Sequence, residues 1–331
     1  MYNIVKENEY TDIEEVCFDN RHIAKVEAAI KKNFDKYFDL FIQSENNMVL
    51  GKDGIAKLQK KFGVGAIKTN IKSNKAMIFK SIILAAIKEF NKNREKYEAI
   101  MDLEVLEEYE DNPNSFKDRV LAHECPIINS TLMNKQAKEL DNYRINYKLA
   151  SPNDLLRVVR NLTEFSNEYY EDLSDYEDYD GISSIAELGL SDLDEDGYTL
   201  YGVIGGGIKS HLLYKIHPSL FPNRSRNAIW ALWYLTNKDT FGCVMDSEFL
   251  MIDIKKSTTQ QNYFYPYGLF AYYALVIYLL IKAKAEEMKV DFDGDYRYVL
   301  VDAFLEFIAE NHDDEIKFLK QQIRDGGMGF V

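Results

Sequence analysis

Apolar residues recur at spacings of three and four along the first half of the chain, a pattern that places them on one face of a helix. One such stripe predicts a helix over 20–43, and a second predicts a helix over 75–95. The segment between them, 51–75, is rich in lysine and interrupted by glycine, which indicates shorter elements. The two stripes consist of Ile23, Val26, Ile30, Phe34, Tyr37 and Phe41, and of Phe79, Ile82, Ile83, Ala86, Ile87 and Phe90.

The second half also reads as helical, with one small β element. Ser151, Pro152 and Asp154 form a helix start, because a Ser N-cap is followed by Pro at the first helical position and a carboxylate at the third. Apolar helices are expected at 266–285 and 298–309. Segments 241–245 and 249–254 predict a β-hairpin. The predicted fold is therefore mainly α, a multi-helix globular protein with a small hairpin or sheet near 241–256.

We place a domain boundary just before the helix that starts at Ser151. It separates an N-terminal helical region, 1–148, from a C-terminal α-rich region, 149–331. Apolar residues make up 46% of the 331 residues, enough for a full core. The three cysteines cannot form a disulfide framework, and the first residues contain no apolar signal segment, so a cytoplasmic protein is expected. Residues 263–281 carry no charge, but only fourteen form an uninterrupted helix, which favours a core helix over a membrane span.

Charge is distributed unevenly along the chain. The net charge is −14, and residues 164–197 hold thirteen acids without a Lys, Arg or His. The remainder is almost neutral, with 41 acids against 40 bases. A basic segment follows, because residues 202–238 contain no acid. Its nucleic-acid-binding candidates are Lys209, Lys215, Arg224 and Arg226. The alternative is that the acidic and basic segments neutralise each other within the fold.

The basic segment opens with a glycine run. Residues 198–204 predict a short strand, Gly205, Gly206 and Gly207 follow, and a helix is expected from about Ile208 to Ile216. Backbone N–H groups at such a turn can hold a phosphate. The Walker spacing is absent, because Ile208 separates the last glycine from Lys209. The run resembles the helix-hairpin-helix turn of base-excision glycosylases, which implies backbone binding of nucleic acid. The downstream loop lacks the family's catalytic Asp, so catalysis does not carry over.

Two acidic motifs are candidates for metal binding. Residues 192–197 carry the alternating carboxylates and glycine of a calcium loop, but Val203 occupies the position of its bidentate Glu. In the predicted hairpin, Asp253 and Lys255 lie two residues apart at the end of an apolar strand. This arrangement resembles the active-site strand of restriction-type nucleases. The resemblance implies catalytic roles for both residues and a metal site formed by Asp246, Glu248 and Asp253. The alternative is an edge strand whose charged end faces solvent.

Two functions remain open. The first is an intracellular nucleic-acid-associated protein whose contact surface includes 202–238, with metal-dependent nuclease activity as its enzymatic form. Its cofactor would be Mg²⁺ or another divalent cation, and its partner DNA or RNA. The second is a non-enzymatic interaction module that binds a basic protein through its acidic, Tyr-rich segment. A membrane partner is not expected in either case.

Overall fold

The computed structural model describes residues 16–174, 179–242, 248–253 and 258–325, with only the backbone described at 44–74, 139, 174, 253, 258 and 321–325. Helices dominate these residues, and the sheet has two antiparallel strands, which confirms the predicted mainly α fold with a small β element. The helical elements before the middle of the chain are α2 (Asn20–Phe90), α3 (Arg94–Ile100), α4 (Leu103–Glu108), α5 (Pro113–Ser115), the π-helix η1 (Phe116–Glu124), α6 (Pro126–Met133), η2 (Lys138–Leu140) and α7 (Asp141–Leu149).

The remaining elements form the centre and the opposite end of the molecule. They are α8 (Pro152–Ser174), η3 (Tyr179–Gly181), α9 (Ile185–Leu188), η4 (Ser191–Asp194), η5 (Asp196–Tyr198), α10 (Gly206–Ile216), α11 (Arg226–Leu235), β1 (Leu250–Asp253), β2 (Thr258–Gln261), α12 (Tyr267–Met288), η6 (Gly294–Tyr296), α13 (Arg297–Asn311) and α14 (Asp313–Asp325).

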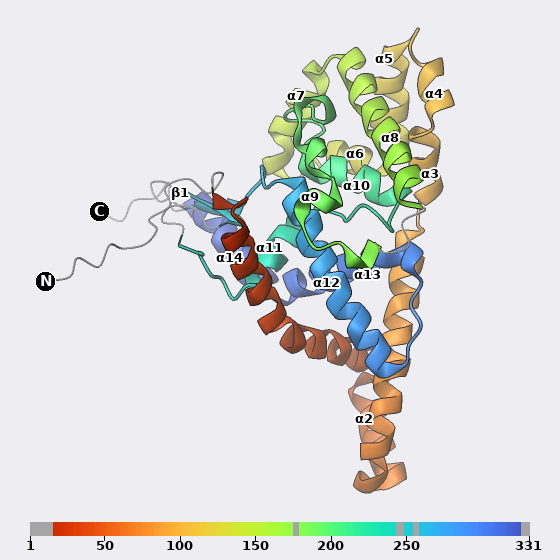
Figure 1. Ribbon diagram of the computed structural model, residues 1–331, viewed down its shortest axis with the longest axis vertical. Helices are drawn as coiled ribbons and strands as arrows, with labels where there is room; N and C mark the ends of the chain where they lie inside the picture. Colours follow the sequence, from red (N-terminus) through yellow and green to blue (C-terminus); the bar gives the residue numbers. More distant parts are fainter. Residues whose placement is uncertain (1–15, 175–178, 243–247, 254–257, 326–331) are drawn as a thin grey trace, which may run out of the picture.

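The long element α2 folds back on itself. Asp39 and Lys75 form an ion pair of 3.0 Å, and the rings of Phe38 and Phe79 lie 5.5 Å apart. In a straight helix, a separation of 36 residues would span about 54 Å at 1.5 Å per residue. The two apolar stripes predicted from sequence therefore belong to two arms that pack together. Figure 1 shows α2 leaving the region of β1 and returning toward α3.

Helix α12 lies at the centre of the core. It packs on α2, α13, α9 and η4, while α11 packs on α13 and α2. By length and composition α12 could cross a membrane, but 72% of its most apolar window is buried within the protein. This burial fits the predicted role of 266–285 as a core helix. Phe34 and Phe304, from opposite ends of the chain, lie in contact in the same core, with ring centroids 5.4 Å apart.

The upper part of the molecule in Figure 1 is a second group of helices. Helix α8 packs on α4, α5 and η1, and α10 packs on α3 and α6. Ser151 caps α8 as expected, because its Oγ accepts the backbone N–H of Asp154 at 3.3 Å. Elements from both sides of the predicted boundary at 148/149 thus pack together, and the boundary itself stays a prediction.

Two predicted β elements differ from the structure. Strand β1 lies within 249–254 as expected, but its partner is β2, with Leu250 opposite Gln261 and Asp253 opposite Thr258. Gln260 and Gln261 therefore lie in a strand. The predicted first strand falls largely on 243–247, outside the described residues. The strand expected at 198–204 is wrong as well. That segment is a tight turn, closed by the Leu200–Ile204 bridge, in which Gly202 adopts a φ of +79°.

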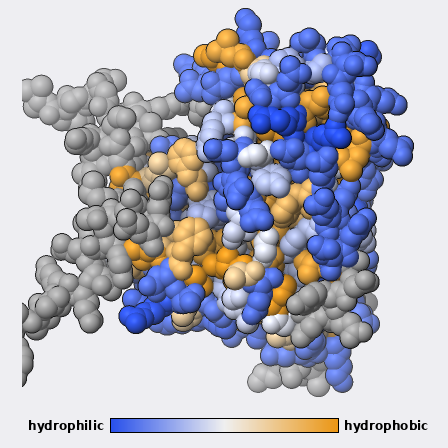
Figure 2. Space-filling model, turned by 45° about the horizontal axis from the view of Figure 1, so that its top comes forward, coloured by the Kyte–Doolittle hydropathy of each residue, from blue (hydrophilic) through white to orange (hydrophobic). Residues whose placement is uncertain are grey.

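Large apolar side chains that remain exposed come from elements far apart in the chain. Leu149 is 77% exposed and Phe264 is 68% exposed. On the face drawn in Figure 2, hydrophobic residues lie among hydrophilic ones. Scattered exposed apolar residues are usual on soluble domains and mark no particular site.

Candidate functional site

The residues of the predicted nuclease strand are only partly within the described chain. Asp253 ends β1, where its backbone pairs with Thr258. Asp246 and Lys255 lie outside the described residues, so the metal and catalytic roles expected for them stay predictions. Glu248 is described, and it lies two residues before the start of β1.

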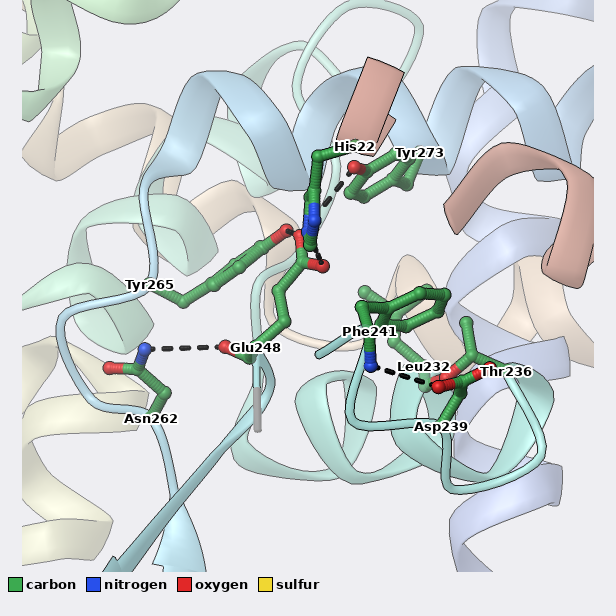
Figure 3. Close-up of polar contacts among 9 residues, drawn as sticks. All are labelled: His22, Leu232, Thr236, Asp239, Phe241, Glu248, Asn262, Tyr265 and Tyr273. Atoms are coloured by element: carbon green, nitrogen blue, oxygen red, sulfur yellow. Dashed lines mark hydrogen bonds and ion pairs between the residues drawn. The ribbon is translucent and has the colours of Figure 1, made fainter. Parts of the chain in front are cut away.

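Glu248 lies in a buried polar cluster rather than at a surface (Figure 3). Its side chain is fully buried, and its Oε2 lies 2.7 Å from Nε2 of His22, whose side chain is 4% exposed. The hydroxyl of Tyr265 donates to Oε1 at 2.6 Å, and that of Tyr273 donates to the same oxygen at 3.5 Å. Three elements contribute these groups: the start of α2, the loop before α12, and α12 itself.

This environment also acts on the two tyrosines. Burial, and then the nearby Glu248, raise the pKa of Tyr265 and of Tyr273 well above the usual phenol value, so both phenols stay protonated and donate. Cys17 is buried beside them and raises both pKa values further. Both oxygens of Glu248 are thus occupied by protein partners. A metal ion at Glu248 would have to displace these partners from a buried carboxylate, which makes the cluster better suited to holding α2 in place.

The described residues contain no group of three or more His, Cys, Asp or Glu side chains arranged to hold a metal ion. In the candidate calcium loop, Asp194 has a different role. Its Oδ1 accepts the N–H of Tyr267 at 2.7 Å, and its Oδ2 accepts the N–H of Gly268 at 3.2 Å. The carboxylate therefore caps the N-terminus of α12, where a negative charge interacts favourably with the helix dipole.

Three of the four residues predicted to bind nucleic acid are inside the protein. Lys209 is 3% exposed, Arg224 is 4% exposed and Lys215 is 8% exposed. Lys209 donates to the carbonyl of Leu193, and Lys215 donates to that of Phe90. These cations stabilise loop and helix-end carbonyls and do not line a surface that a nucleic-acid backbone could contact. Of the four, Arg226 alone is exposed.

Arg224 packs against the glycine run. Its Nη2 donates to the carbonyls of Asn262 at 3.1 Å and Tyr263 at 2.9 Å. A Cβ atom on Gly206 would lie 2.2 Å from Arg224 Nη1, so the glycine makes room for the guanidinium. Burial lowers the pKa of Arg224 to about 10 and that of Lys209 to about 8, and Asp194 opposes both shifts. The protein's own cation therefore occupies the space beside Gly206 in the glycine run.

The acidic segment remains at the surface. Glu168 on α8, Asp192 in η4 and Glu195 between η4 and η5 are exposed. Together with Glu164 they lie near Tyr198, because the charges of all four carboxylates raise the pKa of its hydroxyl, after the larger effect of burial. We call these four carboxylates the acidic face. Glu164 pairs with Arg160 at 2.8 Å. Asp194 lies near Lys209 and Arg224, since its charge opposes the lowering of both pKa values. The alternative in which the acidic and basic segments neutralise each other therefore applies to this aspartate, whose two basic neighbours are buried.

A pocket lies at the C-terminal end of α8. It has a volume of about 270 Å³, and its walls come from the end of α8, η3, the loop after α10, η6 and the start of α13. The residues lining it are Tyr170, Leu173, Tyr179, Ser219, Leu220, Gly294, Asp295 and Arg297. Local sequence patterns could not identify this pocket, because its walls come from three stretches, 170–179, 219–220 and 294–297, that are far apart in the chain.

Arg297 is the cationic group of the pocket. Its guanidinium lies over the rings of Tyr179, 4.1 Å from the centroid, and Tyr278, 4.9 Å from the centroid. It donates through Nη1 to the carbonyl of Ser219, and its Nη2 lies 3.5 Å from Asp180 Oδ1. Within the described chain, Nε has no hydrogen-bond partner. A guanidinium carries five N–H groups, so these contacts leave donor capacity unused.

Comparison with protein-family models, with curated proteins and with solved structures finds no match. The fold and the site define a class in structural terms: a mainly α-helical protein with a buried His–Glu cluster, an exposed acidic face and a pocket that contains an arginine.

Proposed function

We propose that this protein is a non-enzymatic interaction module that binds a cationic partner, such as a basic protein segment, through the acidic face. One observation carries the proposal: four acids of 164–197 lie near Tyr198 and three of them are exposed, while three of the four candidate cations of 202–238 are buried. Of the two functions open from the sequence, the geometry therefore favours the acidic module.

The surface chemistry supports this function physically. Exposed carboxylates on one face sum their fields, and they attract a polycation over roughly a Debye length of ~8–10 Å. Because the attraction acts between exposed groups, it should be strong at low salt and weak at high salt. A tyrosine at the centre of such a group adds an aromatic surface on which lysine or arginine side chains can pack.

The test measures binding of a decalysine peptide by fluorescence anisotropy between 20 and 300 mM NaCl. A triple variant, Glu168→Gln, Asp192→Asn and Glu195→Gln, removes three charges from the acidic face. A matched control, Glu104→Gln, Glu107→Gln and Glu108→Gln, removes three exposed charges from α4. We expect the face variant to lose at least about tenfold in affinity at low salt and the control to lose less than about threefold.

Equal losses in the two variants would mean that only net charge matters, and the proposal would fail. A parallel titration with a generic DNA duplex tests the other function. Salt-sensitive binding of the duplex, lost in Arg226→Ala and kept in the face variant, would instead support a nucleic-acid-associated protein.

A further inference from the structure

Most of the exposed apolar side chains are scattered, but three of them lie together. Ile145 and Leu149 of α7 are 56% and 77% exposed, and Tyr201, in the turn before α10, is 67% exposed. Residues four positions apart lie on the same face of a helix, so Ile145 and Leu149 are neighbours. Figure 1 shows α7 at one edge of the upper group of helices. We call these three side chains the apolar patch.

Asn146 joins the two parts of the apolar patch. A Cβ atom on Gly202 would lie 2.3 Å from Nδ2 of Asn146, so this side chain lies directly against the turn that carries Tyr201. On α7, Asn146 is one position after Ile145 and three before Leu149. At 3.6 residues per turn, the three residues lie within about 100° of the circumference of the helix. The patch therefore extends from α7 across Asn146 to the turn.

Helix α7 exposes these aliphatic side chains and turns its phenols inward. Tyr147 is buried, and its hydroxyl donates to the carbonyl of Lys117 at 2.7 Å. The hydroxyl oxygen of Tyr143 is buried too, and it has no hydrogen-bond partner among the described residues. Burial of an unpaired hydroxyl costs free energy, and exposed aliphatic side chains contribute no stabilisation. A partner that covers Ile145 and Leu149 would offset this cost.

The charges beside the apolar patch indicate the chemistry of that partner. The hydroxyl of Tyr201 donates to Oδ1 of Asp196 at 2.9 Å. Asp196 is exposed and directly follows Glu195 of the acidic face. At the opposite edge of the patch, by helical spacing, α7 carries Arg144 and Lys148. The surface is thus negative on the Tyr201 side of the patch, and it favours a partner with an apolar face and a basic edge.

We infer that the apolar patch binds an amphipathic basic helix of a partner protein. Apolar side chains one turn apart on that helix match the spacing of Ile145 and Leu149, and its lysines or arginines reach Asp196 and the acidic face. The inference rests on the proposed function and makes it more specific, because it adds an apolar anchor to the charges of the cationic partner. A helix that presents apolar residues at positions i and i+4 to an apolar surface is a recurring mode of peptide recognition.

The test compares two peptides of identical composition, made from lysine, leucine and alanine with blocked ends. In the amphipathic peptide, leucine recurs at every fourth residue, so the leucines share one face of a helix. In the permuted peptide, they are spread around the helix. Both peptides carry the same charge, so attraction to the acidic face alone predicts equal affinities. We expect the amphipathic peptide to bind at least about tenfold more tightly by fluorescence anisotropy at 100 mM NaCl.

A double variant, Ile145→Gln and Leu149→Gln, locates the effect, and we call it the patch variant. The matched control, Met77→Gln and Leu84→Gln, removes two apolar side chains of α2 that are 67% and 68% exposed. We expect the patch variant to bind the two peptides with affinities within about twofold of each other, and the control to keep the full preference. Raising NaCl to 300 mM should weaken both peptides and leave the preference unchanged, because salt screens charges and not apolar contacts.

The outcomes separate the inference from the proposed function. Equal affinities of the native protein for the two peptides overturn the inference, and so does a preference that survives in the patch variant. In either case the proposed function stands if the face variant binds both peptides more weakly. If the face variant binds both peptides as tightly as the native protein does, the proposed function fails and the inference fails with it.

Discussion

Nε2 of His22 lies 2.7 Å from Oε2 of Glu248, although the two residues are 226 positions apart in the chain. The contact connects the beginning of α2 to the residues that lead into β1. Both side chains are buried, and Tyr265 donates to the other oxygen of the carboxylate. This relationship makes Glu248 a structural residue whose loss should be measurable without any ligand.

We predict that Glu248→Gln destabilises the protein by about 2–4 kcal/mol, since a buried acceptor of three hydrogen bonds becomes a neutral amide with one acceptor oxygen. The measurement is urea unfolding followed by tryptophan fluorescence. The exposed Glu108→Gln on α4 is the control, and its effect should stay within about 0.5 kcal/mol.

A comparison of the native protein with Glu248→Gln also tests the metal role predicted for Glu248. Because protein donors occupy the oxygens of Glu248, 10 mM Mg²⁺ should not raise the melting temperature of the native protein. Stabilisation by Mg²⁺ that vanishes in Glu248→Gln would contradict this expectation and would favour a metal site.

Asp302 on α13 provides a prediction about pH. It is half-buried beside Asn223, whose Nδ2 donates to its Oδ1 at 3.0 Å. Burial raises the pKa of Asp302 to about 7, and the charge of Glu306 contributes. An ordinary aspartate in the unfolded chain titrates near 4. The native state therefore holds a proton that the unfolded state releases between these values. This contribution to stability is complete below about pH 4 and is lost as pH rises through 7.

We expect Asp302→Asn to remove this pH dependence, because the amide is neutral throughout. At pH 8 the variant should be more stable than the native protein, by about 2–4 kcal/mol at most. The measurement is the free energy of unfolding from pH 4 to 8, with the exposed Asp111→Asn as control. If the curves of the native protein and Asp302→Asn run parallel over that range, the carboxyl does not titrate as its environment indicates.

Two neighbouring glycines test the packing of Arg224. Gly206→Ala would place a Cβ 2.2 Å from Nη1 and 2.9 Å from Cζ of a guanidinium that is held by two carbonyls. We expect a cost of about 1–3 kcal/mol, as in other overpacked interiors. Gly205→Ala is the matched control, since its Cβ meets nothing within 4 Å, and the change should be close to neutral. Thermal unfolding of the two variants decides the question, and equal melting temperatures would refute the close packing.

The helices could be predicted because their signal is local. The stripes from Ile23 to Phe41 and from Phe79 to Phe90 repeat at helical spacing, and the cap at Ser151 is complete within four residues. The pairing of β1 with β2 carries no comparable signal. Thr258 to Gln261 is short and polar, so its strand conformation depends on the partner beside it and not on its own pattern.

The sequence also could not predict whether a charged side chain faces solvent or the interior. Lys209 and Arg224 occur in a segment without acids, which in sequence resembles a surface patch. They are buried because backbone carbonyls at Leu193 and Asn262 lie within reach, and these carbonyls belong to other parts of the chain. His22 and the pocket around Arg297 depend in the same way on contacts between distant segments.

The folded-back α2 has a consequence for the synthesis of this protein. The partners of its first arm lie near the other end of the chain: Asn33 donates to the carbonyl of Leu235, 202 residues later, and Tyr37 contacts His312, 275 residues later. At translation rates of about 5–20 residues per second, the apolar stripe of that arm leaves the ribosome ~10–60 s before these partners exist. Such high contact order makes folding slow, and the nascent chain has to be protected from aggregation until its C-terminal half emerges.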